Sequence, residues 1–218
     1  MIESLVRAAH APRLRLLALT GALLALVPGC ASTNLADLWR DPDFSGPPMR
    51  NVFVIAMKRN RVQRRLWEDG FAAELSKRGV RVTPSYRLFP GAPPDTDRVE
   101  QTVRENDFDG VLIVRQLPTE IQRNYVPGYT SVYPVTYRHR WSGAYDTYFR
   151  QYYTPGYVER QKVVRYQVEM WSARDDGQIV WAGTSESIDP SSAVAVGREV
   201  GRLIVPELVK QRIIAAAR

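Results

Sequence analysis

Aromatic side chains, which bind sugars and protein surfaces, are concentrated in residues 125–158, YVPGYTSVYPVTYRHRWSGAYDTYFRQYYTPGYV, a stretch that also holds Arg138, Arg140 and Arg150. The stretch holds nine of the eleven tyrosines of the chain, between two Pro-Gly-Tyr triplets that begin at Pro127 and Pro155. Tyrosine and tryptophan rings stack on sugars, and tyrosine, tryptophan and arginine are enriched at protein interfaces. What the stretch does therefore depends on whether its rings face the domain or a partner.

Alternation of side-chain types predicts that this stretch is a Tyr-rich β-hairpin insertion. From residue 133 onward, odd positions are mostly aromatic and even positions carry the charges. A loop of Ser142, Gly143 and Ala144 keeps these faces apart, because a two-residue loop would pair odd with even positions. The opposite pairs in this register are Trp141–Tyr145, Tyr137–Phe149, Tyr133–Tyr153, Arg140–Asp146 and Arg138–Tyr148. The candidate binding residues are Tyr133, Tyr137, Trp141, Tyr145, Phe149 and Tyr153 on the aromatic face, with Arg138 and Arg140 on the other.

Three roles for the hairpin stay open at this level. Its aromatic face covers the sheet of its own domain or the segment around Trp39, or it recognises a partner, or it inserts into a membrane as part of an oligomeric pore. Two strands of about ten residues suit a bilayer. Against insertion, the charged side chains Arg138, Arg140, Asp146 and Arg150 would all have to face an aqueous lumen, and tyrosine and tryptophan belong at the membrane interface.

An enzymatic function is not expected, because the residue sets of the common catalytic sites are missing from the sequence. His139 is the one histidine outside the N-terminal 29 residues, and Cys30 is the one cysteine of the chain, so a zinc site of histidine and cysteine ligands cannot be assembled. Neither a G-x-S-x-G elbow nor a Walker loop is present. The aspartates fall in loops, helix starts and turns, where carboxylates serve as caps. A glycosidase with paired carboxylates stays an alternative, but no pair suggests acid and base roles. We expect no cofactor and no metal.

A run of basic residues, Lys58-Arg59-Asn60-Arg61 with Arg64 and Arg65, lies where a strand is expected to give way to a helix. An anion site at the N-terminus of that helix is conceivable. Because no glycine-rich loop lets a phosphate approach the backbone amides, a solvated basic helix face is the preferred interpretation.

The N-terminus has the pattern of an export signal. Arg7, Arg13 and Arg15 form a positive region, and residues 16–27 are an apolar run too short to span a bilayer permanently. The run leads through Pro28 and Gly29 to Cys30, and a lone thiol at this place resembles the lipobox of bacterial lipoproteins. The resemblance implies that residues 1–29 are a lipoprotein signal peptide and that Cys30 is acylated. Ordinary signal cleavage, with Cys30 left as a stray thiol, is the alternative.

The same resemblance implies a place and a class of partner. The residue after the cysteine is Ala31 and not aspartate. By resemblance to Gram-negative lipoproteins, this implies export to the outer membrane, with the protein lipid-anchored on its periplasmic face. Acyl chains are sufficient for stable anchoring without a spanning helix. Residues 1–29 hold three arginines and one glutamate, so the net charge of +7 falls to +5 in the mature chain. A basic chain attracts anionic lipid, acidic glycan or nucleic acid, and export makes nucleic acid the least expected partner.

The remaining pattern predicts one α/β domain over residues 50–218, preceded by a lipidated N-terminus and lead-in over residues 30–49. The lead-in contains Leu35, Leu38 and Trp39, which are apolar enough to dock on the domain. The predicted elements are strands over 51–57, 80–84, 110–114, 158–174 and 178–185, and helices over about 60–79, 97–106 and 191–217. The first helix should bury a stripe of Val62, Leu66, Trp67, Phe71 and Leu75, and the small residues Ala193, Gly197 and Gly201 should bring the last helix close to the sheet. The result is a three-layer α/β sandwich with a mixed sheet of about five strands, β-α-β-α-β-β-β-α or close to it, and a protruding β-hairpin.

This order of elements also carries a family resemblance. WRDPDFSGPP followed by NVFVIAM, then FAAELSKRGV, DGVLIV and DDGQIVWAG, resemble a set of Gram-negative lipoproteins of unknown function over most of residues 35–213. Their domain is similar in fold to the TolB N-terminal domain, LpoB and CsgG. The resemblance implies an outer-membrane-anchored periplasmic lipoprotein, a non-enzymatic binding or scaffold module for an envelope protein or cell-wall glycan. A CsgG-like oligomeric outer-membrane assembly or secretion component is the alternative.

Overall fold

The computed structural model describes residues 33–138, 140, 142, 143, 145–174, 177–190 and 192–216. The signal peptide, Cys30, His139, Trp141 and the start of the turn predicted at Asp175 lie outside these residues. The strands are β1 (Thr33–Arg40), β2 (Asn51–Met57), β3 (Arg81–Pro84), β4 (Gly110–Gln116), β5 (Glu120–Val126), β6 (Tyr129–Arg138), β7 (Tyr145–Thr154), β8 (Tyr157–Ser172) and β9 (Ile179–Ile188). The helices are α2 (Arg61–Ser76), α3 (Ser85–Leu88), α4 (Thr96–Glu105) and α5 (Ala193–Lys210).

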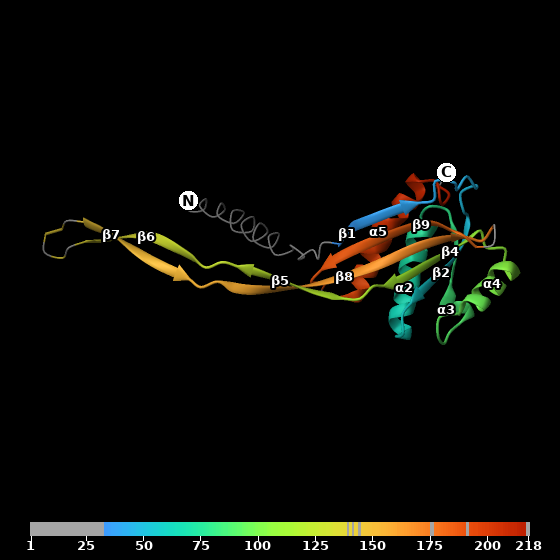
Figure 1. The fold of residues 1–218 in the computed structure, drawn as a ribbon, viewed down its shortest axis with the longest axis horizontal. Helices are drawn as coiled ribbons and strands as arrows, with labels where there is room; N and C mark the ends of the chain where they lie inside the picture. The colour runs from blue at the N-terminus through green and yellow to red at the C-terminus, as the bar shows by residue number, and fades with distance from the viewer. Residues whose placement is uncertain are drawn as a thin grey trace, which may run out of the picture. The chain divides into compact units, whose positions relative to one another are not determined.

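The predicted α/β sandwich with a mixed sheet is confirmed (Figure 1). Seven strands, two more than predicted, form the main sheet in the order β1-β9-β8-β4-β2-β3, with β5 added along β8. The strands β3, β2 and β4 are parallel, as expected for β-α-β units, and β8, β9 and β1 add on antiparallel. Residues 33–40 of the predicted lead-in form the edge strand β1, so the sheet begins at Thr33 rather than at residue 51.

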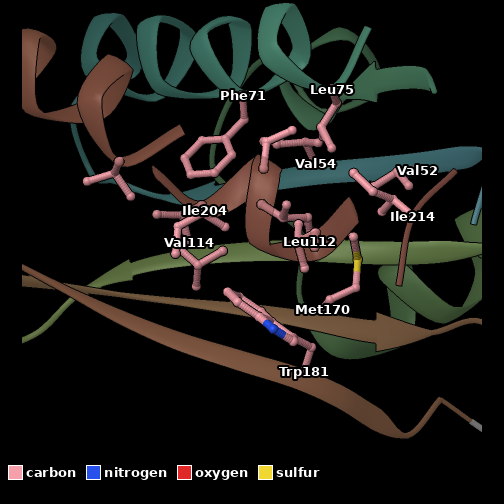
Figure 2. Close-up of a cluster of buried hydrophobic side chains, with 14 of the residues drawn as sticks. Val52, Val54, Phe71, Leu75, Leu112, Val114, Met170, Trp181, Ile204 and Ile214 are labelled. Carbon is pink, nitrogen blue, oxygen red and sulfur yellow. The ribbon is translucent and has the colours of Figure 1, made fainter. Parts of the chain in front are cut away.

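Strand β2 shows why the sheet is covered on both sides. Its residues Val52 to Ala56 are all buried, as its continuous apolar run predicts. Val52, Val54 and Ala56 belong to the large core under α2 and α5, whereas Phe53 and Ile55 belong to a smaller core on the opposite face. Figure 2 shows Phe71 and Leu75 of α2 and Ile204 of α5 over the sheet residues of the large core. The smaller core includes Phe108 and Val103, which places α4 in the third layer.

Helix α2 begins as the sequence predicts, because the side chain of Asn60 accepts hydrogen bonds from the backbone N–H groups of Val62 and Gln63. The predicted apolar stripe is only partly right. Trp67, Phe71 and Leu75 are buried, but Val62 and Leu66 are 64% and 41% exposed. Arg64 and Glu68 take their places on the buried face, where their charges neutralise each other.

Helix α5 is shorter than predicted, and its small residues serve a different contact. A Cβ atom added at Gly197 would lie 2.9 Å from the indole ring of Trp67, and one at Gly201 would lie 3.5 Å from Glu74. A Cβ at Gly197 would be closer to Trp67 than side chains normally pack. The absence of side chains at these glycines therefore lets α5 approach helix α2 rather than the sheet.

Candidate functional site: a β-ribbon carrying tyrosine and arginine

The Tyr-rich stretch lies in a long two-stranded ribbon. Strand β5 pairs antiparallel with the first half of β8, and β6 pairs antiparallel with β7 (Figure 1). The register is the same in both parts, because Val126 pairs with Tyr157 and, three residues further along each strand, Tyr129 pairs with Thr154. The residues between are Pro127-Gly128 and Pro155-Gly156, whose prolines have no N–H to give to a ladder. We call residues 120–138 and 145–163 the ribbon.

The predicted register of the hairpin is wrong. Tyr133 pairs with Arg150, Tyr137 with Asp146 and Arg138 with Tyr145, so none of the predicted opposite pairs forms within the described residues. The physical reason is the length of the loop, which spans the six residues 139–144 instead of three. A loop with an even number of residues pairs odd with even positions, which distributes the aromatic side chains over both faces. Contacts that fit the observed register include a 2.7 Å hydrogen bond between the hydroxyls of Thr136 and Thr147.

Opposite residues of an antiparallel ladder share a face, which defines two faces of the ribbon. The tyrosine face carries Tyr125, Tyr129, Tyr133, Tyr137, Tyr148 and Tyr152, together with the cations Arg123, Arg150, Arg160 and Lys162 and one acid, Asp146. The mixed face carries Tyr145, Phe149, Tyr153 and Tyr157, together with Arg138, Glu120 and Glu159. The predicted binding residues are therefore divided between the two faces. Arg140 lies exposed in the turn, and Trp141 lies outside the described residues.

Each face is continuous through the two Pro-Gly pairs. A Cβ atom added at Gly156 would lie 2.5 Å from the hydroxyl of Tyr125, and one at Gly128 would lie 2.7 Å from the hydroxyl of Tyr153. By register, Gly156 and Tyr125 belong to the tyrosine face, and Gly128 and Tyr153 to the mixed face. Each glycine thus leaves space for a ring that reaches across the interruption on its own face.

Side chains on both faces are open to solvent. On the tyrosine face the exposed fraction ranges from 41% for Tyr148 to 69% for Tyr125, and on the mixed face Phe149 is also 69% exposed. The alternative in which the rings cover the sheet of their own domain is wrong for the described residues. Trp39 is 47% exposed and belongs to β1, so the hairpin does not bury the lead-in either.

Rings and cations of the tyrosine face also contact each other. The rings of Tyr137 and Tyr148 meet edge to face at 5.9 Å, and the guanidinium of Arg150 lies 5.6 Å from the ring of Tyr148. At the base, Arg123 stands directly opposite Arg160, and like charges in this position destabilise a strand pair. Of the acidic side chains on the nearby mixed face, Glu120 binds Arg165 at 2.8 Å.

The basic run near residue 58 is divided: Arg59, Arg61 and Arg65 are exposed, as a solvated helix face predicts, whereas Lys58 and Arg64 are buried. The carboxylate of Glu68 accepts hydrogen bonds from Arg64, Ser85 and the backbone N–H groups of Ala56 and Tyr86, at 2.7–3.1 Å. Arg64 also donates to the carbonyls of Phe89 and Gly91. Since Arg64 and Glu68 are both bonded within the protein, this pair connects α2 to α3 and the following loop and offers no free group for chemistry.

Among the described residues, Lys58 is an ionisable group whose environment clearly shifts its pKa. Its ammonium donates a 2.9 Å hydrogen bond to Gln116 and lies 4.6 Å and 4.4 Å from the rings of Trp67 and Tyr166. Burial lowers the pKa of Lys58 to about 8 and raises the pKa of Tyr166. A lowered lysine pKa suits a nucleophile, but here the ammonium is enclosed between two rings and only 7% of the residue is exposed.

A groove of about 830 Å³ lies between α4 and the sheet face that carries Ile55, Val111 and Ile113. Two of its lining residues, Arg115 and Trp171, donate hydrogen bonds to the carboxylate of Glu169, which also accepts one from Gln167. Among the described residues, no group of three histidine, cysteine, aspartate or glutamate side chains is placed to hold a metal ion.

The sequence reasoning missed much of the tyrosine face. Tyr125, Tyr129, Tyr133 and Tyr137 are spaced by four, a spacing that also places residues on one face of a strand. This spacing was the signal in the sequence that could have placed the four tyrosines on one face of the ribbon. The part of the chain that the structure describes contains no helix long and apolar enough to cross a membrane.

No protein-family model matches the chain, and no curated protein matches it. Among solved structures, the chain is similar to a PelC dodecamer from Paraburkholderia phytofirmans, with 13% identity, a TM-score of 0.43 and coverage of 86% of this chain and 100% of that chain. It is similar to Lipoprotein GNA1162 from Neisseria meningitidis, with 12% identity, a TM-score of 0.38 and coverage of 73% and 98%. A PDZ domain protein from Parabacteroides distasonis shows 12% identity, a TM-score of 0.39 and coverage of 82% of this chain and 36% of that chain. A likeness at this level carries no argument about function, so the proposals below rest on the residues of this chain.

Proposed function

We propose that the chain is an outer-membrane-anchored periplasmic lipoprotein that acts as a non-enzymatic binding or scaffold module for an envelope protein or cell-wall glycan. Its recognition element is the β6–β7 hairpin. The observation that carries the proposal is the exposure of aromatic rings on both faces of β6 and β7, where no described part of the chain covers them. Aromatic side chains in this number are typical of a surface that a partner buries.

The energetics of the hairpin support a partner. An isolated two-stranded hairpin is marginally stable in water, and β6 pairs only with β7. Burying about 100 Å² of ring surface contributes about 2.5 kcal/mol at 25 cal/mol per Å². Contact with two or three of the exposed rings therefore stabilises the hairpin and provides binding energy at the same time.

The lead-in supports anchoring close to a membrane surface. In the sequence, residues 31–49 allow a tether of up to about 65 Å, but β1 begins at Thr33, only three residues after Cys30. If Cys30 is acylated, the chain between the lipid and the sheet reaches no further than about 11 Å. A linker of this length would hold the sheet close to the membrane surface.

The anchor is tested by metabolic labelling with palmitate. Wild-type protein should be labelled and Cys30→Ala should not. Equal labelling of both proteins contradicts the anchor.

Recognition is tested by crosslinking in cells. The sharpest variant lacks residues 129–154, because the remaining Pro127-Gly128 and Pro155-Gly156 can close β5 and β8 with a four-residue loop. We expect the full chain to give crosslinked complexes that this variant does not form, at an unchanged level of protein. Identical complexes from both proteins contradict a recognition role for the hairpin.

A second candidate function, an oligomeric outer-membrane assembly or secretion component, is favoured by one observation. On the mixed face, positions 130–136 of β6 and 147–153 of β7 carry no charged side chain, and Arg138 lies next to the loop. Asp146 and Arg150 are on the opposite face, so the charges do not crowd onto one surface together with Arg138. The mass of the protein after mild detergent extraction tests this candidate. A monomer contradicts it.

A further inference from the structure

The tyrosine rings of the tyrosine face are regularly spaced along β6 and β7, and pairing of the two strands does not by itself require this spacing. From the base of β6 to its tip, the rings alternate between the strands, in the order Tyr129, Tyr152, Tyr133, Tyr148 and Tyr137. Successive rings in this order are two residues apart along the ribbon, which corresponds to about 6.8 Å. The row from Tyr129 to Tyr137 is thus about 27 Å long. A ligand that contacts the whole row must be extended.

Every aromatic ring of this face carries a hydroxyl group, whereas Phe149 lies on the mixed face. A tyrosine ring offers a flat surface for stacking and a polar group at its edge. The rings stand 41% to 69% exposed along an open strand pair. Flat, hydroxyl-bearing rings on an open surface suit stacking against sugar rings better than they suit an apolar protein anchor, which needs a closed pocket.

Unpaired positive charge continues the same face toward the sheet. Arg123 lies opposite Arg160, and Lys162 is the next residue along β8 on this face. Neither guanidinium of the opposed pair has an acidic partner among the residues that the structure describes. Asp189, at the base of the ribbon, accepts the backbone N–H of Lys162. With Arg150, the face has four cations and one acid, Asp146, near the tip. An anionic ligand removes the repulsion between the opposed arginines.

We propose that the tyrosine face binds a linear acidic polysaccharide, a polymer of carboxylate-bearing sugar residues. Tyr133, Tyr152 and their neighbours stack on the sugar rings, and Arg123, Arg150 and Arg160 pair with the carboxylates. The fork of an arginine matches a carboxylate with two parallel hydrogen bonds. The proposal rests on the proposed function, that the ribbon is a recognition element, and adds the chemical class of its ligand.

The test measures binding of the full mature chain in detergent to polygalacturonate, with dextran as a neutral polymer and single-stranded oligothymidylate as a polyanion that also stacks. Affinity electrophoresis or calorimetry gives the dissociation constants. We expect binding to polygalacturonate that weakens as salt concentration rises, little binding to dextran, and weaker binding to oligothymidylate.

Two pairs of variants separate the contributions of rings and charges. Tyr133→Ala with Tyr152→Ala should weaken polygalacturonate binding about tenfold or more, because two stacking surfaces are removed. The matched ring control is Tyr157→Ala, which removes an exposed tyrosine of β8 from the mixed face. Arg123→Gln with Arg160→Gln should weaken binding about tenfold, whereas Arg59→Gln with Arg61→Gln, which removes the same charge from the exposed start of α2, should not. All substituted side chains are exposed, so the melting temperatures should agree within about 2 °C.

The outcomes separate this proposal from the one on which it rests. Four results would each contradict an acidic polysaccharide as the ligand: equal affinity for dextran, tighter binding of the oligothymidylate, no binding of polygalacturonate, or losses in the ring and charge controls equal to those of the variants they match. If one of these results is obtained, but deleting residues 129–154 abolishes the crosslinked complexes seen with the full chain in cells, only the ligand class is wrong. If those complexes persist without the hairpin, the recognition function fails as well.

Discussion

Replacing Arg64 tests whether α2 buries a charge where the sequence suggests a basic surface. Arg64 is 1% exposed, and its guanidinium bonds to Glu68, Ser85 and two carbonyls. Arg64→Met keeps the length of the side chain but leaves the buried carboxylate of Glu68 without its counter-charge. Removing one partner of a buried ion pair costs about 3–5 kcal/mol.

This cost has a measurable size in the whole protein. For a domain of this length, 1 kcal/mol corresponds to about 2–4 °C in melting temperature, so Arg64→Met should lower it by about 6–20 °C. The matched control is Arg65→Met, which removes an exposed arginine from the next position and should cost within about 0.5 kcal/mol. Thermal melts and urea unfolding of the mature chain with Cys30→Ser give both values.

A double substitution separates the ion pair from the backbone contacts of Glu68. Arg64→Met with Glu68→Leu removes both charges but leaves the N–H groups of Ala56 and Tyr86 without an acceptor. These two groups should cost about 1–3 kcal/mol each. If Arg64→Met costs no more than Arg65→Met, Arg64 is not buried and the packing of α2 described above is incorrect.

Three further predictions concern the ribbon and the core. In a Cys30→Ala background, Thr136→Cys with Thr147→Cys should form a disulfide on mild oxidation, because the two positions are directly opposite each other. The control pair, Thr136→Cys with Arg150→Cys, should not form one. A disulfide in the control pair alone would contradict the observed register. The pKa of Lys58 is lowered to about 8 in the folded state, so between about pH 8 and 10.5 the unfolded chain binds more protons than the folded chain, and the free energy of unfolding should rise with pH. The free energy should be measured below pH 10, because above that pH the raised pKa of Tyr166 acts in the opposite direction. An equally steep rise in Lys58→Met would refute the assignment to Lys58. Gly156→Ala places a Cβ against Tyr125 and should speed hydrogen exchange in β6 and β7 without changing the global melting temperature much, whereas Gly91→Ala, which meets nothing within 4 Å, should change neither.

The elements of the core were predictable because their sequences carry redundant signals. β2 is a continuous apolar run, and α2 has Asn60 as a cap and Gly79 just past its end. β8 and β9 alternate clearly enough to fix which side chains are buried. In each case, burial and local conformation agree, so the pattern is sufficient.

The register of the hairpin and the burial of Arg64 needed information that the pattern does not contain. A hairpin register follows from the length of its loop, and the residues around Gly143 fit three residues or six. With both faces in water, burial imposes no constraint that would correct the error. Arg64 looked like part of a basic surface because the sequence does not show which side chains meet, although Glu68 four residues later was a visible partner.

The most direct test of the account is photo-crosslinking in living cells from single positions on the ribbon. A photoreactive aromatic residue in place of Tyr133, which is 57% exposed, should give crosslinked species with an envelope component. The same residue in place of Val62, which is 64% exposed on α2, should give none. Equal crosslinking from both positions, or crosslinks from Val62 alone, would contradict the claim that the exposed rings of the ribbon form the recognition surface.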